Sequence, residues 1–236
     1  MSAAVGPFAV DQGLVRPQGD HTTVRIYNTN TQKIIHSTFA TPNGQTQYAG
    51  DFAIPGVGGT GSPIKLEFID PGGATTGQLL PTQQVKQRLF IPELGELEVS
   101  MVDAANAAVF VRAKDIGLTG LELPDELERR PDVLAQLELI RIHASVAMGI
   151  TSSLEEARAA FVSPAQPNPT LYGKLVYAAD IDLMSRVISS GQPHRALPLT
   201  VSLCTAVAAR IQGTIVAELL TSTAPNQGAL RLGRPS

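Results

Sequence analysis

The stretch Thr200–Gly213, TVSLCTAVAARIQG, decides the fold class of this 236-residue chain. Threonine is favoured at the start of a helix and glycine just past its end, so the stretch predicts a helix. Its apolar residues, which include Val201, Cys204 and Ile211, lie on nearly all sides, and a helix that is apolar all round is buried inside its domain. Strand-like segments such as 22–27 must then wrap around this helix. The sequence therefore predicts an α+β fold.

Two further patterns predict particular elements. Segments 33–39 and 45–48 flank a Pro-Asn-Gly turn at residues 42–44, which favours a β-hairpin. Asp125–Met148 has apolar residues three and four positions apart and predicts one amphipathic helix, with Pro131 near an early turn.

Composition excludes several classes of function. A net charge of −3 with scattered Lys and Arg gives no electrostatic reason to expect nucleic acid. No apolar run reaches the roughly 18 residues that a membrane span needs. A single cysteine cannot form an internal disulfide, and the four histidines are too far apart to suggest a metal site. No secretory signal is visible, so we expect a soluble, cytoplasmic protein.

A glycine-rich run, DPGGATTGQLLPT at residues 70–82, follows an apolar strand-like segment at 64–69. A strand that leads into Pro-Gly-Gly and then Thr-Thr leaves backbone N–H groups and two hydroxyls together. Such a nest in front of a helix start attracts anions. A glycine run also marks a simple turn. The local sequence favours neither reading.

Several other polar residues stand at informative places. Thr200 and Ser202 lie at the predicted helix start, where they either cap the helix or help bind an anion. His194 precedes that helix and could reach the same pocket or lie in an exposed loop. Asn106 interrupts an apolar strand pair, which suggests a turn or a ligand contact. Cys204 lies on this apolar helix, which favours packing as a small apolar side chain over a role as nucleophile or base.

Read together, the motifs resemble the PrpF family of isomerases. The matching stretches run in family order and cover most of the chain: AVGPFAVDQGLV (4–15), VRIYNTNT (24–31), GDFAIPGVGGTGSPI (50–64), DPGGATTGQLLPT (70–82), VSMVDAANAAVFVRAKDIGLTGLELP (99–124), LELIR (137–141), SSGQPHRALPLT (189–200) and CTAVAARIQGT (204–214).

The resemblance implies a diaminopimelate-epimerase-like fold of two lobes, each wrapped around a central helix. Residues 1–58 would then be part of the first lobe. Residues 59–225 would form the second lobe, with its central helix at about 200–212. Residues 226–236 would begin a return segment to the first lobe, which we expect to be incomplete because the chain looks clipped at both ends.

The family's reactions move a double bond within small unsaturated di- or tricarboxylates, such as 2-methylaconitate, aconitate or oxalomesaconate, by an allylic 1,3-proton shift without a cofactor. The family's catalytic Cys and Lys have no match in this chain, since Cys204 belongs to the second-lobe helix. No catalytic residue is therefore assigned, and we expect the chain alone not to isomerise cis- or trans-aconitate. The resemblance implies these substrate contacts: Gly73, Thr75, Thr76, Asn106, His194, Thr200, Ser202 and Ser236.

The expected partner is a small carboxylate, and a homodimer is an expected assembly. The alternative function is that of a non-catalytic fragment that binds carboxylates or a partner protein.

Overall fold

The computed structural model describes residues 2–54, 58–150, 157–170, 173, 175–189, 191–220 and 228–233. The chain forms two compact units, Met1–Pro71 and Gly72–Ser236. The boundary that the sequence predicts, after residue 58, falls inside the first unit. This is because strand β3 (Lys65–Phe68) pairs with a strand of that unit.

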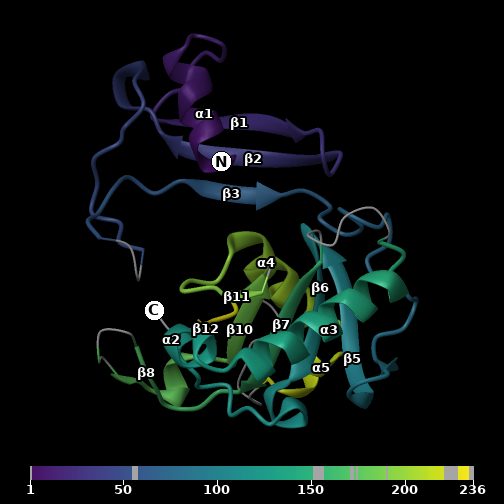
Figure 1. Ribbon diagram of the computed structural model, residues 1–236. Helices are drawn as coiled ribbons and strands as arrows, with labels where there is room; N and C mark the ends of the chain where they lie inside the picture. The colour runs from purple at the N-terminus through teal and green to yellow at the C-terminus, as the bar shows by residue number, and fades with distance from the viewer. Residues whose placement is uncertain are drawn as a thin grey trace. The chain divides into compact units, whose positions relative to one another are not determined.

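The first unit is a three-stranded antiparallel sheet with one helix against it (Figure 1). β1 (His21–Asn28) pairs with β2 (Lys33–Ala40), and β2 pairs with β3. The chain thus reverses between β1 and β2, and the predicted hairpin around residues 42–44 is wrong. Pro42–Gly44 instead forms a single 3₁₀ turn, with Asn43 at a φ of 54°, that ends β2.

Helix α1 (Ser2–Asp11) packs on this sheet and continues through Pro7. Gly6 allows a close approach, because a Cβ placed there would lie 2.6 Å from Oγ of Ser37 on β2. The opposite side of α1 exposes Val5 and Phe8.

The second unit is built on a mixed sheet in the order β11-β10-β7-β6-β5-β4, with β12 beside β10. β6 and β7 are parallel, as are β10 and β12, and the other neighbours are antiparallel. A separate pair consists of β8 (Asn168–Pro169) and β9 (Leu175–Val176). The strands of the main sheet are β4 (Gln87–Ile91), β5 (Gly95–Ala104), β6 (Asn106–Arg112), β7 (Arg158–Pro164), β10 (Leu183–Ser189), β11 (Gln192–Pro193) and β12 (Leu232–Gly233).

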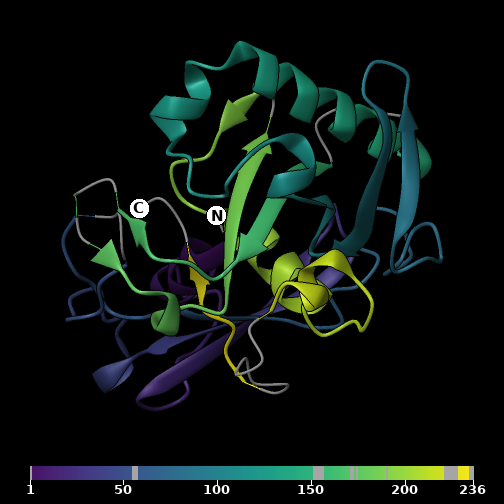
Figure 2. The same ribbon diagram turned by 90° about the horizontal axis from the view of Figure 1, so that it is seen from below.

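Helices cover both faces of this sheet (Figures 1 and 2). One face packs on α3 (Pro131–Ala147) and the other on α4 (Leu199–Ala208) with the short α5 (Ile215–Glu218). The predicted helix at 125–148 is in fact two helices, α2 (Pro124–Glu128) and α3, because Pro131 begins α3 at its first turn, where a missing N–H costs nothing.

The structure confirms the burial of α4 for one face, on which Val201, Cys204 and Ala208 are fully inaccessible. Leu203, Ala206 and Val207 are only partly buried and Leu199 is exposed, so the predicted burial on all sides is not seen. Its ends differ from the prediction. The helix begins at Leu199 after Pro198, so Thr200 lies within the first turn and is not the cap. It ends at Ala208, after which the N–H groups of Arg210 and Ile211 donate to the carbonyls three residues earlier, as in a 3₁₀ turn. In the described part of the chain, no helix combines the length and apolarity that crossing a membrane requires.

Candidate functional site

The glycine-rich run forms a nest of donors, and a carboxylate of the protein itself occupies it. Asp103, at the end of β5, is fully buried. Its Oδ2 accepts bonds from the backbone N–H of Thr75 at 2.8 Å, the backbone N–H of Thr76 at 2.6 Å and the Thr76 hydroxyl at 2.9 Å. Charge-assisted bonds of this kind are the strong ones. The backbone amides that the sequence assigned to an external anion are thus directed at Asp103.

Backbone contacts hold the same loop against the end of β5. The N–H of Gly73 donates to the carbonyl of Asp103 at 2.8 Å, and the N–H of Asp103 donates to the carbonyl of Leu79 at 3.0 Å. Gly73 has a φ of 70°, and a Cβ there would lie 2.5 Å from the backbone of Gly77. These contacts fix the path of the loop at the end of β5. Among the described residues, the Thr75 hydroxyl has no partner, so it is the group of this run that a ligand can still use.

Strand pairing brings the other predicted residues to the same end of the sheet as this loop. Asn106 is the first residue of β6 and lies directly across a one-residue turn from Ala104. Gly72 bridges to Ala104 as well. Because β7 is parallel to β6 and β10 is antiparallel to β7, the last residues of β10 and the β11 turn that leads to His194 are also at this end.

Helix α4 starts at this end too. The Cys204 thiol, one turn into α4, donates to the carbonyl of Val102 near the end of β5. The backbone N–H of Ile215, which follows the end of α4, donates to Oγ of Ser100, two residues earlier on β5. The start of α4 therefore lies nearer the end of β5 than its C-terminus does. No side chain caps α4, and the first described bond is from the N–H of Ser202 to the carbonyl of Pro198. The preceding N–H groups thus remain donors to an anion.

The two hydroxyls at this helix start differ. The Ser202 hydroxyl donates back to the carbonyl of Pro198 at 3.1 Å, so it serves the helix itself. The Thr200 hydroxyl has no partner among the described residues and is half-buried. Of the two, Thr200 is better placed to contact a ligand.

His194 is half-buried, and its backbone N–H donates to the carbonyl of Val187 on β10 at 2.9 Å. Its Nε2 atom is inaccessible and has no hydrogen-bond partner among the described residues. Burial, together with the nearby positive charge of Arg158, holds the pKa of His194 below its usual value. The lowered pKa favours the neutral imidazole, which can donate or accept one hydrogen bond at that nitrogen.

Cys204 does not supply a reactive thiolate. It is fully buried, and burial raises the pKa of its thiol to about 12. The thiol donates to the Val102 carbonyl at 3.4 Å. These contacts confirm the expectation that Cys204 packs as a small apolar side chain.

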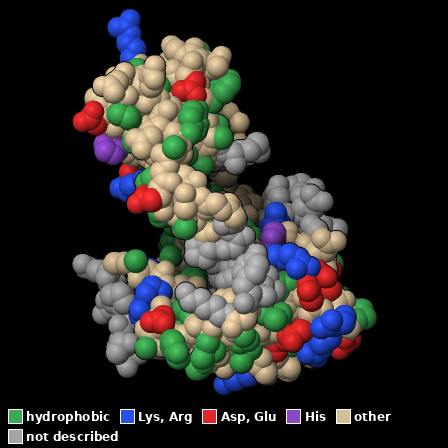
Figure 3. Space-filling model, turned by 90° about the vertical axis from the view of Figure 1, so that its left-hand side faces the viewer, with side chains coloured by type: hydrophobic (Ala, Val, Ile, Leu, Met, Phe, Trp, Pro, Cys, Tyr) green, Lys and Arg blue, Asp and Glu red, His purple; other side chains and the backbone are tan. Residues whose placement is uncertain are grey.

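The remaining predicted contact, Ser236, lies outside the described residues. Within the described ranges, no group of three or more His, Cys, Asp or Glu side chains could hold a metal ion. On the face of the molecule that Figure 3 shows, acidic and basic side chains lie beside one another and form no broad patch of one charge.

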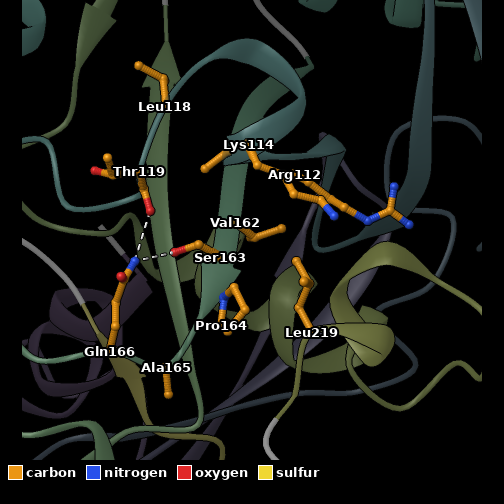
Figure 4. Close-up of a pocket in the computed structure, with 11 residues that line it drawn as sticks. Arg112, Lys114, Leu118, Thr119, Val162, Ser163, Pro164, Ala165, Gln166 and Leu219 are labelled. Carbon is orange, nitrogen blue, oxygen red and sulfur yellow. Dashed lines mark hydrogen bonds between the residues drawn. The ribbon is translucent and has the colours of Figure 1, made fainter.

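A pocket of about 340 Å³ lies at the opposite end of the sheet, where β6 and β7 end (Figure 4). Nε2 of Gln166 bridges the carbonyl of Thr119 and the hydroxyl of Ser163 across its wall. Arg112 is paired there with Glu98, Glu218 and Asp115. None of the predicted substrate contacts lines this pocket.

The architecture defines a class: an α+β protein in which a helix packed on the sheet begins at the same end as a hydrogen-bonded glycine-rich loop and an asparagine turn. The crystal structure of methylitaconate-delta-isomerase has the same fold. It matches with a TM-score of 0.88 and 37% sequence identity, over 100% of this chain and 62% of that chain.

The family model described as "PrpF protein" matches residues 1–236, and the chain belongs to the PrpF family. The 3-methylitaconate isomerase of Eubacterium barkeri is 38% identical over 247 residues, which include 100% of this chain and 64% of the relative. The 2-methyl-aconitate isomerase of Shewanella oneidensis is 33% identical over 250 residues, covering 100% of this chain and 62% of the relative. The chain thus spans less than two thirds of the length of these relatives.

Proposed function

We propose that this chain contributes the carboxylate-binding half of a cofactor-independent isomerase. The reaction is an allylic 1,3-proton shift in a small unsaturated di- or tricarboxylate such as 2-methylaconitate, aconitate or oxalomesaconate. The match to the PrpF family along the whole chain carries this proposal. The names of the two curated relatives, both isomerases of methylated unsaturated acids, support the substrate class.

The chemistry suits the geometry of the second unit. A base removes the allylic proton, the electron pair moves into a dienolate, and a proton returns at the other end of the allylic system, so the product has the same formula as the substrate. The negative charge of the dienolate needs donors that are already in place. The N–H groups at the start of α4 and the side chains of Asn106 and Thr75 provide such donors at one end of the sheet.

The groups that bind the substrate differ from the group that would transfer the proton. Cys204 is the only cysteine of the chain, and its thiol is buried with a raised pKa. The described residues therefore fit substrate binding better than proton abstraction. This observation also favours a second candidate, in which the chain binds carboxylates without catalysis.

A chimera separates the two candidates. The chain would be joined to the parts of the Eubacterium barkeri isomerase that it does not match, and double-bond migration would be followed by NMR in D₂O. We expect the chain alone to bind trans-aconitate without turnover and the chimera to exchange the allylic proton. A folded chimera that binds but never exchanges favours the non-catalytic candidate. Failure of the chain to bind any of these acids would refute both.

A further inference from the structure

The pocket at the opposite end of the sheet lies where two parallel neighbouring strands end. β6 ends at Arg112 and β7 ends at Pro164, and both residues line the pocket, whose volume is about 340 Å³. In open α/β sheets, small ligands bind outside the carboxyl ends of the strands. A volume of this size is also typical of pockets that take small molecules. Position and size therefore fit a small ligand.

Hydrogen bonds hold two walls of this pocket together without a ligand. Nε2 of Gln166 donates to the carbonyl of Thr119 at 2.8 Å and to Oγ of Ser163 at 3.2 Å (Figure 4). A Cβ at Gly120 would lie 2.1 Å from the same Oγ, so the close approach of this segment to β7 needs glycine. The walls are thus in place before anything binds, which lowers the cost of ordering them around a ligand.

Apolar side chains from both hydrophobic clusters of the second unit line the pocket. Ala113 and Leu118 belong to the cluster on the α3 side of the sheet. Val162 belongs to the cluster on the α4 side, and the partly buried Leu219 packs against it. An aliphatic ligand would bury apolar surface against these side chains, and such burial favours binding. A ligand with several charges would leave some of them unmatched there.

Two donors in the pocket remain for a ligand. Oγ of Ser163 accepts a bond from Gln166, so the hydroxyl still has its own proton to donate, and the described residues offer no acceptor for it. Lys114 lines the pocket and is exposed, and within the described ranges it pairs with no carboxylate. An ammonium and a hydroxyl together suit a carboxylate, which accepts from both.

The carboxylates around the pocket already have partners. Three of them pair with Arg112: Glu98, Asp115 and Glu218. A fourth, Glu122, accepts bonds from the backbone N–H groups of Thr119 and Gly120. Lys114 is therefore the charged group at this pocket that a ligand can still match.

We propose that this pocket is a second binding site, which takes a small apolar monocarboxylate. The aliphatic body of the acid contacts Leu118, Val162 and Leu219, and its carboxylate pairs with Lys114 and accepts the proton of the Ser163 hydroxyl. This site does not depend on the proposed function, because none of the predicted contacts for a polycarboxylate lines it.

The test is a titration of protein with ¹³C-labelled methyl groups, followed by NMR, with isocaproate as the probe. We expect saturable shifts of the methyl groups of Leu118, Val162 and Leu219 with a millimolar dissociation constant, as so small a ligand allows. Isocaproamide, which has the same body without the charge, should bind several-fold more weakly at the same methyl groups. Trans-aconitate should not shift them. Absence of saturable shifts with isocaproate at these three residues would overturn the proposal.

Two variants separate the charge from the hydroxyl. K114M, at an exposed position, should fold like wild type and weaken isocaproate about three- to fivefold without affecting isocaproamide, because exposed ion pairs are weak. S163A should weaken both ligands, since each accepts from the hydroxyl. The control is K33M, which makes the same change of charge on β2 of the first unit and should match wild type. If K114M weakens acid and amide equally, or S163A affects neither, the proposed placement of the carboxylate is wrong.

Discussion

Replacing Asp103 should loosen the glycine-rich loop. One buried oxygen of Asp103 accepts three bonds from Thr75 and Thr76. Alanine at position 103 would leave the N–H groups of Thr75 and Thr76 without a partner, whereas the Thr76 hydroxyl can still donate to the carbonyl of Gln78 at 3.1 Å. These two N–H groups are only partly buried, so water can reach them in part, and about 1 kcal/mol for each gives about 2 kcal/mol for D103A. Asparagine keeps an acceptor but loses the charge, so D103N should cost about 1 kcal/mol.

The assay combines urea unfolding, followed by circular dichroism, with amide hydrogen exchange at Thr75 and Thr76. The control is D70N, at an exposed position of the same loop with a φ of 45°, which asparagine tolerates. D70N should change stability by no more than about 0.5 kcal/mol. If D103A keeps the protection of both threonine amides and matches D70N in stability, the role of Asp103 in holding the loop is wrong.

Three other predictions concern single residues. Cys204 should react with a thiol reagent at pH 8 only after unfolding, because burial raises its pKa to about 12; rapid labelling of the folded chain would contradict this. A hydrogen bond from Arg231 lowers the pKa of the buried Asp182 in the folded protein. Asp182 therefore stabilises the fold at any pH above its unfolded pKa of about 3.9, and this stabilisation is lost as the pH falls through the lower pKa of the folded state. D182N should thus be less stable than wild type at pH 7 in urea titrations, with a difference that shrinks below about pH 4; a constant difference down to pH 2 would refute the linkage. G73A should destabilise by about 2–4 kcal/mol through strain and a backbone clash, whereas G77A, where a Cβ meets nothing within 4 Å, should cost about 1 kcal/mol; equal effects on thermal unfolding would argue against the clash.

The sequence predicted well the elements that depend only on residues close to one another in the chain. The apolar residues of α4 correctly predicted a helix that packs against the sheet, because that pattern depends on the helix alone, although only one face of α4 is buried. The start of α4 was harder to predict from the sequence, because the helix follows Pro198 and has no side-chain cap that would mark its first residue. Pro7 does not interrupt α1, because the helix packs closely on β2 at Gly6 and this tertiary contact outweighs the lost bond.

Long-range pairing limited the prediction of the site. The local sequence left open whether the run at 70–82 is a cluster of donors or a simple turn, and the structure shows a cluster of donors. Its acceptor, Asp103, comes from a different strand, and no local pattern shows which carboxylate reaches the nest. The place of His194 at the same end of the sheet likewise depends on which strands are neighbours, and the parallel pairing of β6 with β7 is visible only in the fold.

The most direct test of the central claim, that the second unit binds small polycarboxylates where α4 begins, is a titration of ¹⁵N-labelled protein with trans-aconitate followed by NMR. We predict that the largest shifts fall on the backbone amides of Leu199–Val201, on the side-chain amide of Asn106 and on the backbone amides of residues 73–76. Absence of saturable shifts, or shifts confined to the pocket between Arg112 and Gln166, would contradict it.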